Sequence, residues 1–201
     1  MAIKNEERGS TMLETILYIC LLIALGGAMA RTVASVFNRY NTGRLAQQVI
    51  DLKRSILAYT AVNEDYSTLT LDGMIEKNAL PLDMRKKLHA MGGKFNLGPA
   101  TDNNLHGANS THNKYMFYIT FEGIDKEACV ELLTQGQFFT DGSEMDSLQL
   151  NNNYCWHYEY SLFRFDNCGY STSLKSQHFT IAEAMKGCLR EEDNKITWIF
   201  S

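Results

Sequence analysis

Proline is scarce and charge is sparse in this chain of 201 residues, which contains two prolines and 21% charged residues. So few prolines exclude a proline-rich stalk, and 45% hydrophobic residues exclude a disordered chain. No segment repeats at the periods of roughly 20 to 50 residues that are typical of solenoids and propellers. The 19 basic residues are scattered and the net charge is −4, which argues against a general nucleic-acid-binding protein. The chain must therefore fold into one or two domains.

Motifs of catalysis, cofactor binding and metal binding are also missing. The five histidines have no acidic or nucleophilic partner at a recognisable spacing: His89, His106, His112, His157 and His178. Cys155 and His157, with Cys168, lack the C-x-x-C spacing of a zinc site. The segment from Asp141 to Asp146 lacks the residue order of an EF-hand and is predicted to be a polar turn. The sequence predicts no enzyme, no cofactor and no metal.

The most apolar segment, Thr15 to Ala30, contains no charged residue. With its flanks, about residues 13–36, it exceeds the roughly 20 helical residues that cross a hydrocarbon core of about 30 Å. The segment is predicted to be a transmembrane helix. An acid in such a helix costs about 2 to 3 kcal/mol near the membrane centre and less near its end, so Glu14 is expected to have a partner.

The residues ahead of this segment carry a motif: Gly9 is followed by Ser10, Thr11, Met12, Leu13 and Glu14. This order resembles the processing site of type IV prepilins. In that family a prepilin peptidase in the inner membrane cuts after the glycine and methylates the new N-terminus. The resemblance implies a leader peptide over 1–9 and an N-methylated amine on Ser10. Glu14 of a neighbouring copy would then neutralise that amine during assembly, since an unpaired charge among packed helices is costly.

Two other interpretations of the N-terminal region remain open. Glu14 could instead lie at the level of the lipid headgroups. Alternatively, signal peptidase could cut at the small-residue site Ala28–Ala30, which would leave Arg31 as the first residue. The leader itself is not strongly basic, because two acids balance its two basic residues: Lys4, Glu6, Glu7 and Arg8.

Beyond the apolar segment, hydrophobic residues recur at alternating spacings of four and three: Leu45, Val49, Leu52, Ile56 and Tyr59. This pattern predicts one amphipathic helix face. No proline precedes Pro81. A single helix is therefore predicted over 10–62, with its second half packed in a globular head formed by 63–201.

The head is predicted to be α+β, with the long helix packed on an antiparallel sheet. Asp72 is expected to cap a short helix that stops before Pro81. The segment 92–113 is expected to be irregular, and the Asn-rich loops 103–104 and 151–153 are candidate surfaces for adhesion. The remaining expected elements are strands at 115–121, 154–162 and 195–200 and helices at 125–134 and 181–188.

Five cysteines occur: Cys20 in the apolar segment, and Cys129, Cys155, Cys168 and Cys188 in the head. Four head cysteines allow three pairings, and disulfides are expected outside the cytoplasm. Four short segments of the head resemble the C-terminal half of type IVb pilins: 118–121, 127–132, 181–188 and 194–200. In that subfamily the two matching cysteines bond to each other. The resemblance therefore implies a Cys129–Cys188 disulfide and leaves Cys155 and Cys168 as a second candidate pair.

Together these resemblances imply a structural subunit of a type IVb pilus that polymerises through its N-terminal helix. Its expected partners are copies of itself, the prepilin peptidase, the inner-membrane assembly platform and, before assembly, the membrane. The precursor would reside in the bacterial inner membrane and the filament outside the cell, where it would serve adhesion, aggregation or conjugative contact. The alternatives are a type II secretion pseudopilin, a minor pilin, and a signal-anchored or secreted periplasmic binding protein or enzyme.

Overall fold

A computed structural model describes the backbone over 6–61, 65–100, 115–135, 145–151, 154–159, 162–167 and 180–201. Side chains are described from residue 12 onward within these ranges, except at 30, 31, 34 and 146 and throughout 154–167. The chain divides into two compact units, Met1–Tyr40 and Asn41–Ser201. The helix α1 (Glu6–Thr60) contributes the first unit and the beginning of the second.

The first unit is the apolar part of α1. Its segment Met12–Met29 is long and apolar enough to cross a membrane, by length and composition. The predicted helix over 10–62 agrees closely with α1, which begins earlier at Glu6 and ends at Thr60. Gly26 and Gly27 do not interrupt the helix, although glycine lowers helix stability by about 1 kcal/mol relative to alanine.

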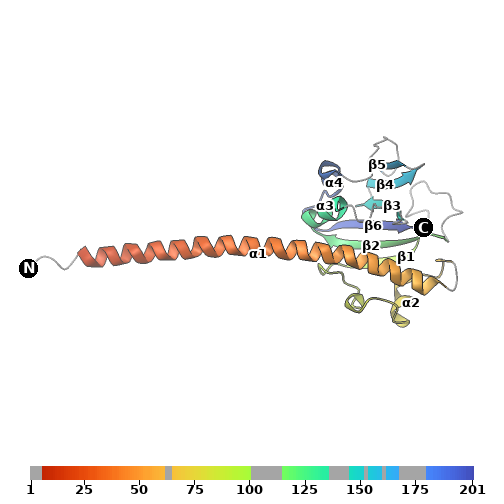
Figure 1. The fold of residues 1–201 in the computed structure, drawn as a ribbon, viewed down its shortest axis with the longest axis horizontal. Coiled ribbons are helices and arrows are strands. Elements are labelled where there is room, and N and C mark those ends of the chain that lie inside the picture. The colour runs from red at the N-terminus through yellow and green to blue at the C-terminus, as the bar shows by residue number, and fades with distance from the viewer. Residues whose placement is uncertain are drawn as a thin grey trace, which may run out of the picture. The chain divides into compact units, whose positions relative to one another are not determined.

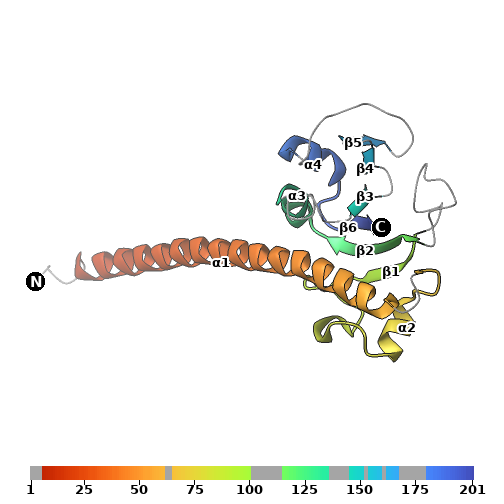
Figure 2. The same cartoon turned by 45° about the vertical axis from the view of Figure 1, so that its right-hand side comes forward.

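The second unit contains a six-stranded antiparallel sheet in the order β1-β2-β6-β3-β4-β5. Its strands are β1 (Phe95–Pro99), β2 (Phe117–Ile124), β3 (Met145–Leu150), β4 (Tyr154–Glu159), β5 (Leu162–Asn167) and β6 (Asn194–Phe200). The C-terminal part of α1 runs along the β1–β2 side of this sheet in both views (Figures 1 and 2). The architecture is thus α+β, with a long N-terminal helix on an antiparallel sheet, as predicted.

The amphipathic face of α1 supplies the centre of the core. Leu45, Val49, Leu52 and Ile56 are completely buried, and Tyr59 packs at the margin. Opposite them lie the large side chains of the central strands, which include Phe117, Phe121 and Trp198. Residues four and three apart share one side of a helix, so a single stripe of the sequence reaches the sheet.

Within the described residues, the second unit also contains four short helices: α2 (Leu71–Glu76), the 3-10 helix η1 (Leu82–Met84), α3 (Lys126–Thr134) and α4 (Ile181–Gly187). Asp125 caps α3 by accepting from the Ala128 N–H at 2.7 Å, and Thr180 forms a capping box with Glu183 in α4. α3 and α4 lie side by side in both views (Figures 1 and 2). Their bounds confirm the predicted helices at 125–134 and 181–188.

The prediction for the short helix was wrong in its cap. Thr70, not Asp72, caps α2, because the Thr70 hydroxyl accepts from the Gly73 N–H at 3.1 Å. Asp72 lies in the first turn, where its negative charge is favourable for a different reason, the helix dipole. The helix ends at Glu76, and the backbone then turns at Asn78 through a positive φ of 52°.

Three predictions about strands need correction. β1 lies within the segment predicted to be irregular, because an edge strand of five residues that ends in Gly98 and Pro99 has no alternating pattern. β3 was not predicted. The strand expected at 154–162 is β4, which ends at Glu159, and it pairs with β5, which was not predicted. The strand expected at 115–121 is β2, which lies between β1 and β6 as its apolar sequence indicated.

Several predicted features lie outside the described residues. They are the leader before Glu6, most of the expected irregular segment (101–113), the polar turn from Asp141, the loop residues 103–104 and 152–153, and Cys168.

Candidate functional site

The apolar surface of α1 is the first candidate site. Thirteen large hydrophobic side chains between Met12 and Val36 are at least half exposed, and Met12 reaches 70%: Met12, Leu13, Ile16, Leu17, Tyr18, Ile19, Leu21, Leu22, Ile23, Leu25, Met29, Val33 and Val36. They face every side of the helix. Because exposing so much apolar surface to water is unfavourable, this helix requires either lipid or other protein around it.

The predicted processing and assembly residues lie at the start of this helix. Gly9 and Ser10 belong to the first turns of α1, and Glu14 follows one turn later with an exposed side chain. Glu14 is thus the acid at the N-terminal end of the apolar surface. The cut after Gly9 and the pairing of Glu14 with the Ser10 amine stay predictions.

The disulfide region is the second candidate site. Cys129 in α3 and Cys188 at the end of α4 form a disulfide with a Cα–Cα distance of 5.9 Å, and both side chains are fully buried. This is the pairing that the type IVb resemblance implied. Cys155 lies in β4, but Cys168 falls outside the described residues, so the second bridge stays a prediction. Cys20 in the apolar helix is a free, exposed thiol.

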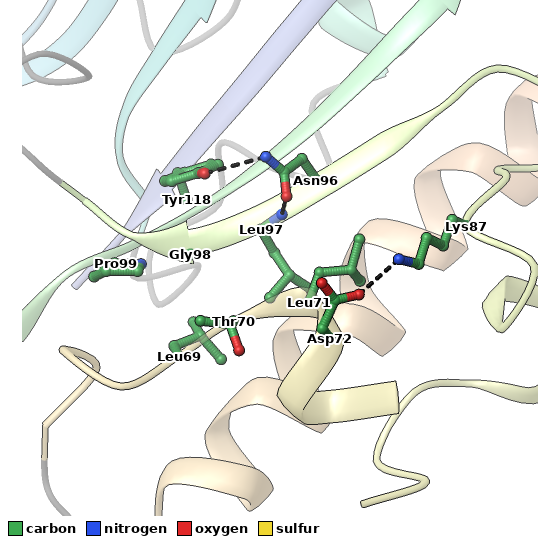
Figure 3. Close-up of a pocket in the computed structure, with 10 residues that line it drawn as sticks. All are labelled: Leu69, Thr70, Leu71, Asp72, Lys87, Asn96, Leu97, Gly98, Pro99 and Tyr118. Atoms are coloured by element: carbon green, nitrogen blue, oxygen red, sulfur yellow. Dashed lines mark hydrogen bonds and ion pairs between the residues drawn. The ribbon is translucent and has the colours of Figure 1, made fainter. Parts of the chain in front are cut away.

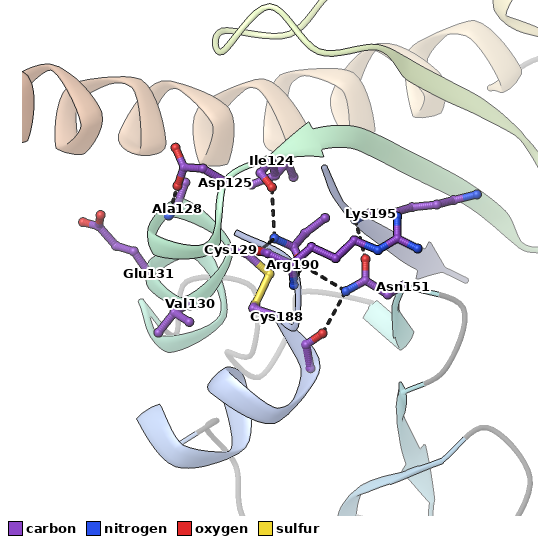
Figure 4. The surroundings of a disulfide bond; sticks show 12 residues. Ile124, Asp125, Ala128, Cys129, Val130, Glu131, Asn151, Cys188, Arg190 and Lys195 are labelled. Atoms are coloured by element: carbon purple, nitrogen blue, oxygen red, sulfur yellow. Dashed lines mark hydrogen bonds between the residues drawn. A yellow bond between two sulfur atoms is a disulfide. The ribbon is translucent and has the colours of Figure 1, made fainter. Parts of the chain in front are cut away.

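Asn151 lies in the surroundings of the disulfide (Figure 4), where its side chain bonds to the Gly187 carbonyl and to Asn194. Asn194 is completely buried at the start of β6, and the Asn151 side chain donates to the Asn194 Oδ1 at 3.0 Å. The sequence predicts a surface loop for adhesion at Asn151, whereas in the structure its side chain bonds to Asn194 within the head. Its positive φ of 52° is compatible with asparagine, but no pattern along the chain indicates a partner 43 residues away.

A further set of polar contacts joins the loop after α2 to α1. The buried Gln48 side chain donates to Asp83 Oδ2 at 2.7 Å and accepts from the Ala90 N–H at 2.8 Å. Arg44 also bonds Asp83, at 3.1 Å. Burial would raise the pKa of Asp83, but the hydrogen bonds from Gln48 and Arg44 outweigh it and hold the pKa below its ordinary value.

A shallow pocket lies at the free edge of β1, between that strand and α2 (Figure 3). Lys87 and Asp72 form an ion pair of 2.6 Å on one side. On the other, Asn96 donates to the Tyr118 hydroxyl at 3.4 Å and accepts from the Leu97 N–H at 2.9 Å. Partial burial raises the pKa of Tyr118. These four polar side chains already bond to one another or to the backbone, so they hold the shape of the sheet edge.

Comparison with known proteins agrees with this geometry. The family described as PilS N terminal matches residues 39–201. Two relatives are the major structural subunits of bundle-forming pilus from Escherichia coli O111:H- and from Escherichia coli O127:H6 (strain E2348/69 / EPEC). Each is 23% identical over an alignment 201 positions long, and the alignment covers 97% of this chain and 95% of the relative.

A solved structure with a similar fold is the crystal structure of TcpA, a type IV pilin from Vibrio cholerae El Tor biotype. The TM-score is 0.51 at 12% identity, and the match covers 81% of this chain and 99% of that one. At this identity the likeness shows the fold alone, and it agrees with the α+β architecture of a long helix on an antiparallel sheet.

Proposed function

The chain belongs to the PilS family and is a type IVb pilin, and from this premise we propose that it is cut after Gly9 and polymerises through α1 into an extracellular filament. The observation that carries the proposal is the apolar surface of Met12–Met29, which is exposed on all sides. The same surface suits two successive environments. Lipid covers it in the precursor, and the helices of other copies cover it in the filament.

Glu14 sets the register in which the helices of neighbouring copies pack during assembly. Cleavage after Gly9 frees a cationic amine on Ser10, which must leave the headgroup region when the helix enters the filament. An uncompensated charge among packed helices is strongly unfavourable, so a carboxylate at the same depth on a neighbouring copy stabilises the packed state. Glu14 is the acid placed for this, just ahead of the uncharged segment that begins at Thr15.

The precursor resides in the bacterial inner membrane, where a prepilin peptidase and an assembly platform act on it. Cleavage by signal peptidase at Ala28–Ala30 is less favourable, since α1 is helical throughout this segment whereas that enzyme needs an extended site. The two curated relatives are named as structural subunits, which supports an assembly role in place of an enzymatic one. The head then provides the filament surface for adhesion, aggregation or conjugative contact.

The test is the N-terminal residue and its mass, measured on protein from sheared filaments and from intact membranes. We expect N-methylated Ser10 in the filaments. The variant Gly9→Leu serves as a control and should stay uncut in the membrane fraction. An N-terminus at Arg31 would indicate an ordinary secreted protein, and an uncut Met1 in the wild type an anchored one. Either result contradicts the proposal.

A further inference from the structure

The carboxamide of Asn194 uses all of its hydrogen-bonding capacity inside the protein. Its Nδ2 donates to the Ile124 carbonyl at 3.1 Å and to the Arg190 carbonyl at 2.7 Å. Its Oδ1 accepts from the Arg190 N–H at 3.2 Å and from Asn151 Nδ2 at 3.0 Å. A carboxamide has two donor hydrogens and two acceptor lone pairs, so this fully buried side chain is saturated.

Asn151 extends the same network from the end of β3. Its Nδ2 donates to the Gly187 carbonyl at 2.9 Å as well as to Asn194, and its Oδ1 accepts from the Lys195 N–H at 2.8 Å. The two side chains, called the asparagine pair below, thus connect β3, β6, the end of α4 and the loop 188–193. Their other partners are main-chain atoms, which fixes the course of the backbone.

These partners lie close in sequence to each of the two disulfide cysteines. Ile124 immediately precedes Asp125, the residue that caps the helix of Cys129. Gly187 directly precedes Cys188, and Arg190 follows it by two residues. The asparagine pair bonds to neither cysteine, so its contacts do not require the disulfide to be present.

Packing next to Cys188 also restricts the backbone. A Cβ on Gly187 would clash with the Leu150 side chain, so α4 ends in close contact with β3. The loop after Cys188 is held on α3 by the Lys126 N–H, which donates to the Glu191 carbonyl at 3.1 Å. Noncovalent contacts therefore hold the chain on both sides of Cys188, independently of the disulfide.

We propose that the asparagine pair positions Cys188 against Cys129, so that the reduced head already holds the two thiols within bonding distance. Oxidation joins the two sulfurs and releases two electrons and two protons. With oxidised glutathione as the acceptor, these convert one glutathione disulfide into two glutathione thiols. Thiols held together by the fold have a high effective concentration, which favours the protein disulfide at equilibrium. Asn151 and Asn194 are thus positioning residues for this step.

The experiment measures that effective concentration. The full-length chain in detergent micelles is equilibrated in buffers of reduced and oxidised glutathione, the free thiols are alkylated, and the fraction of Cys129–Cys188 peptide is read by mass spectrometry. This readout is specific to one pair of cysteines, so the other three do not need to be replaced. Asn194→Ala leaves buried main-chain groups without partners, and we expect it to lower the effective concentration by roughly 10- to 100-fold.

A matched variant separates positioning from general stability. Gln48→Ala also removes a buried carboxamide that bonds an N–H and a side chain, but on α1. We expect it to lower the stability of the head and leave the effective concentration within about twofold of wild type. Protease resistance of the reduced chain checks that each variant is folded. If reduced Asn194→Ala is not folded, the effective concentration is measured in Asn151→Ala instead. Asn151 is partly exposed, and its replacement removes three hydrogen bonds. Unchanged effective concentration in the folded asparagine variants, or an equal fall in Gln48→Ala, overturns the proposal.

Discussion

His89 shows at the scale of a residue how burial decides chemistry. The ring is 4% exposed and stacks on Phe121, with 5.1 Å between ring centroids. Its Nε2 lies 2.7 Å from the Glu122 carbonyl oxygen, and its Nδ1 accepts from the Met91 N–H at 3.3 Å. A carbonyl only accepts and an N–H only donates, so these contacts require the neutral ring with its proton on Nε2.

This arrangement predicts a loss of stability in mild acid. Burial lowers the pKa of His89, and the hydrogen bond with Glu122 only partly opposes it. Because the folded pKa lies below the ordinary value of about 6.5, the unfolded chain binds more protons below that pH. The contribution of neutral His89 to the free energy of unfolding is complete above a pH of about 6.5. It is lost as the pH falls from there through the pKa of His89 in the folded protein.

Urea unfolding of the full-length chain in micelles between pH 7.5 and 5 measures this loss. In His89→Phe an aromatic ring is still available to stack on Phe121, but position 89 no longer titrates. We therefore expect the decline in the free energy of unfolding to be smaller than in wild type. Each unit of difference in pKa corresponds to about 1.4 kcal/mol. Parallel pH profiles for the two proteins would show that His89 does not titrate differently on folding.

Two glycines are predicted to respond in opposite directions to alanine. A Cβ on Gly93 would clash with the Glu122 carbonyl and the His89 ring, whereas a Cβ on Gly43 in α1 meets nothing within 4 Å. We expect Gly93→Ala to lower the free energy of unfolding by about 1 to 3 kcal/mol through overpacking. Gly43→Ala should raise it by up to about 1 kcal/mol through helix propensity. Urea unfolding compares them, and a similar change in both variants would contradict the steric argument.

At the scale of elements, the stripe along α1 explains why the helix binds its sheet. Leu52 is completely buried, while Leu57, on another side of the same helix, is 36% exposed. We expect Leu52→Ala to cost about 2 to 5 kcal/mol because it leaves a cavity, and Leu57→Ala to cost less than about 1 kcal/mol. Denaturant unfolding of both variants tests the face assignment, which fails if Leu57→Ala is the more costly change.

The elements also show the limits of prediction from sequence. α3, α4 and β6 were predicted to within a residue, because caps such as Asp125 and the apolar run before Phe200 are local features. β1, β3 and β5 were missed, since a short strand is stabilised by its neighbours in the sheet and β1 ends in a proline. The pairing of Cys129 with Cys188 came only from family resemblance, because four cysteines leave three possibilities open.

At the scale of the whole molecule, the central prediction is that Glu14 acts in assembly and not in folding. Its side chain is exposed at the N-terminal end of the apolar surface, so Glu14→Ala should leave the monomer stable and cut after Gly9. We expect filament yield, measured by shearing and electron microscopy, to fall to a small fraction of wild type. Glu76→Ala removes an exposed acid from the head and should leave the yield unchanged. Normal filaments in Glu14→Ala would remove the charge-pairing argument.

Features whose physical cause lies within a few turns of the chain can be predicted from the order of the residues. The uncharged segment from Thr15 to Ala30 predicts a helix whose apolar surface is covered by lipid or by copies of itself. The stripe from Leu45 to Ile56 predicts the helix face that packs on the sheet. The bond between Asn151 and Asn194 and the neutral state of His89 arise only when the chain is folded. Those depend on atoms 43 and 33 residues apart, whose meeting is set by strand order and register and not by any local preference.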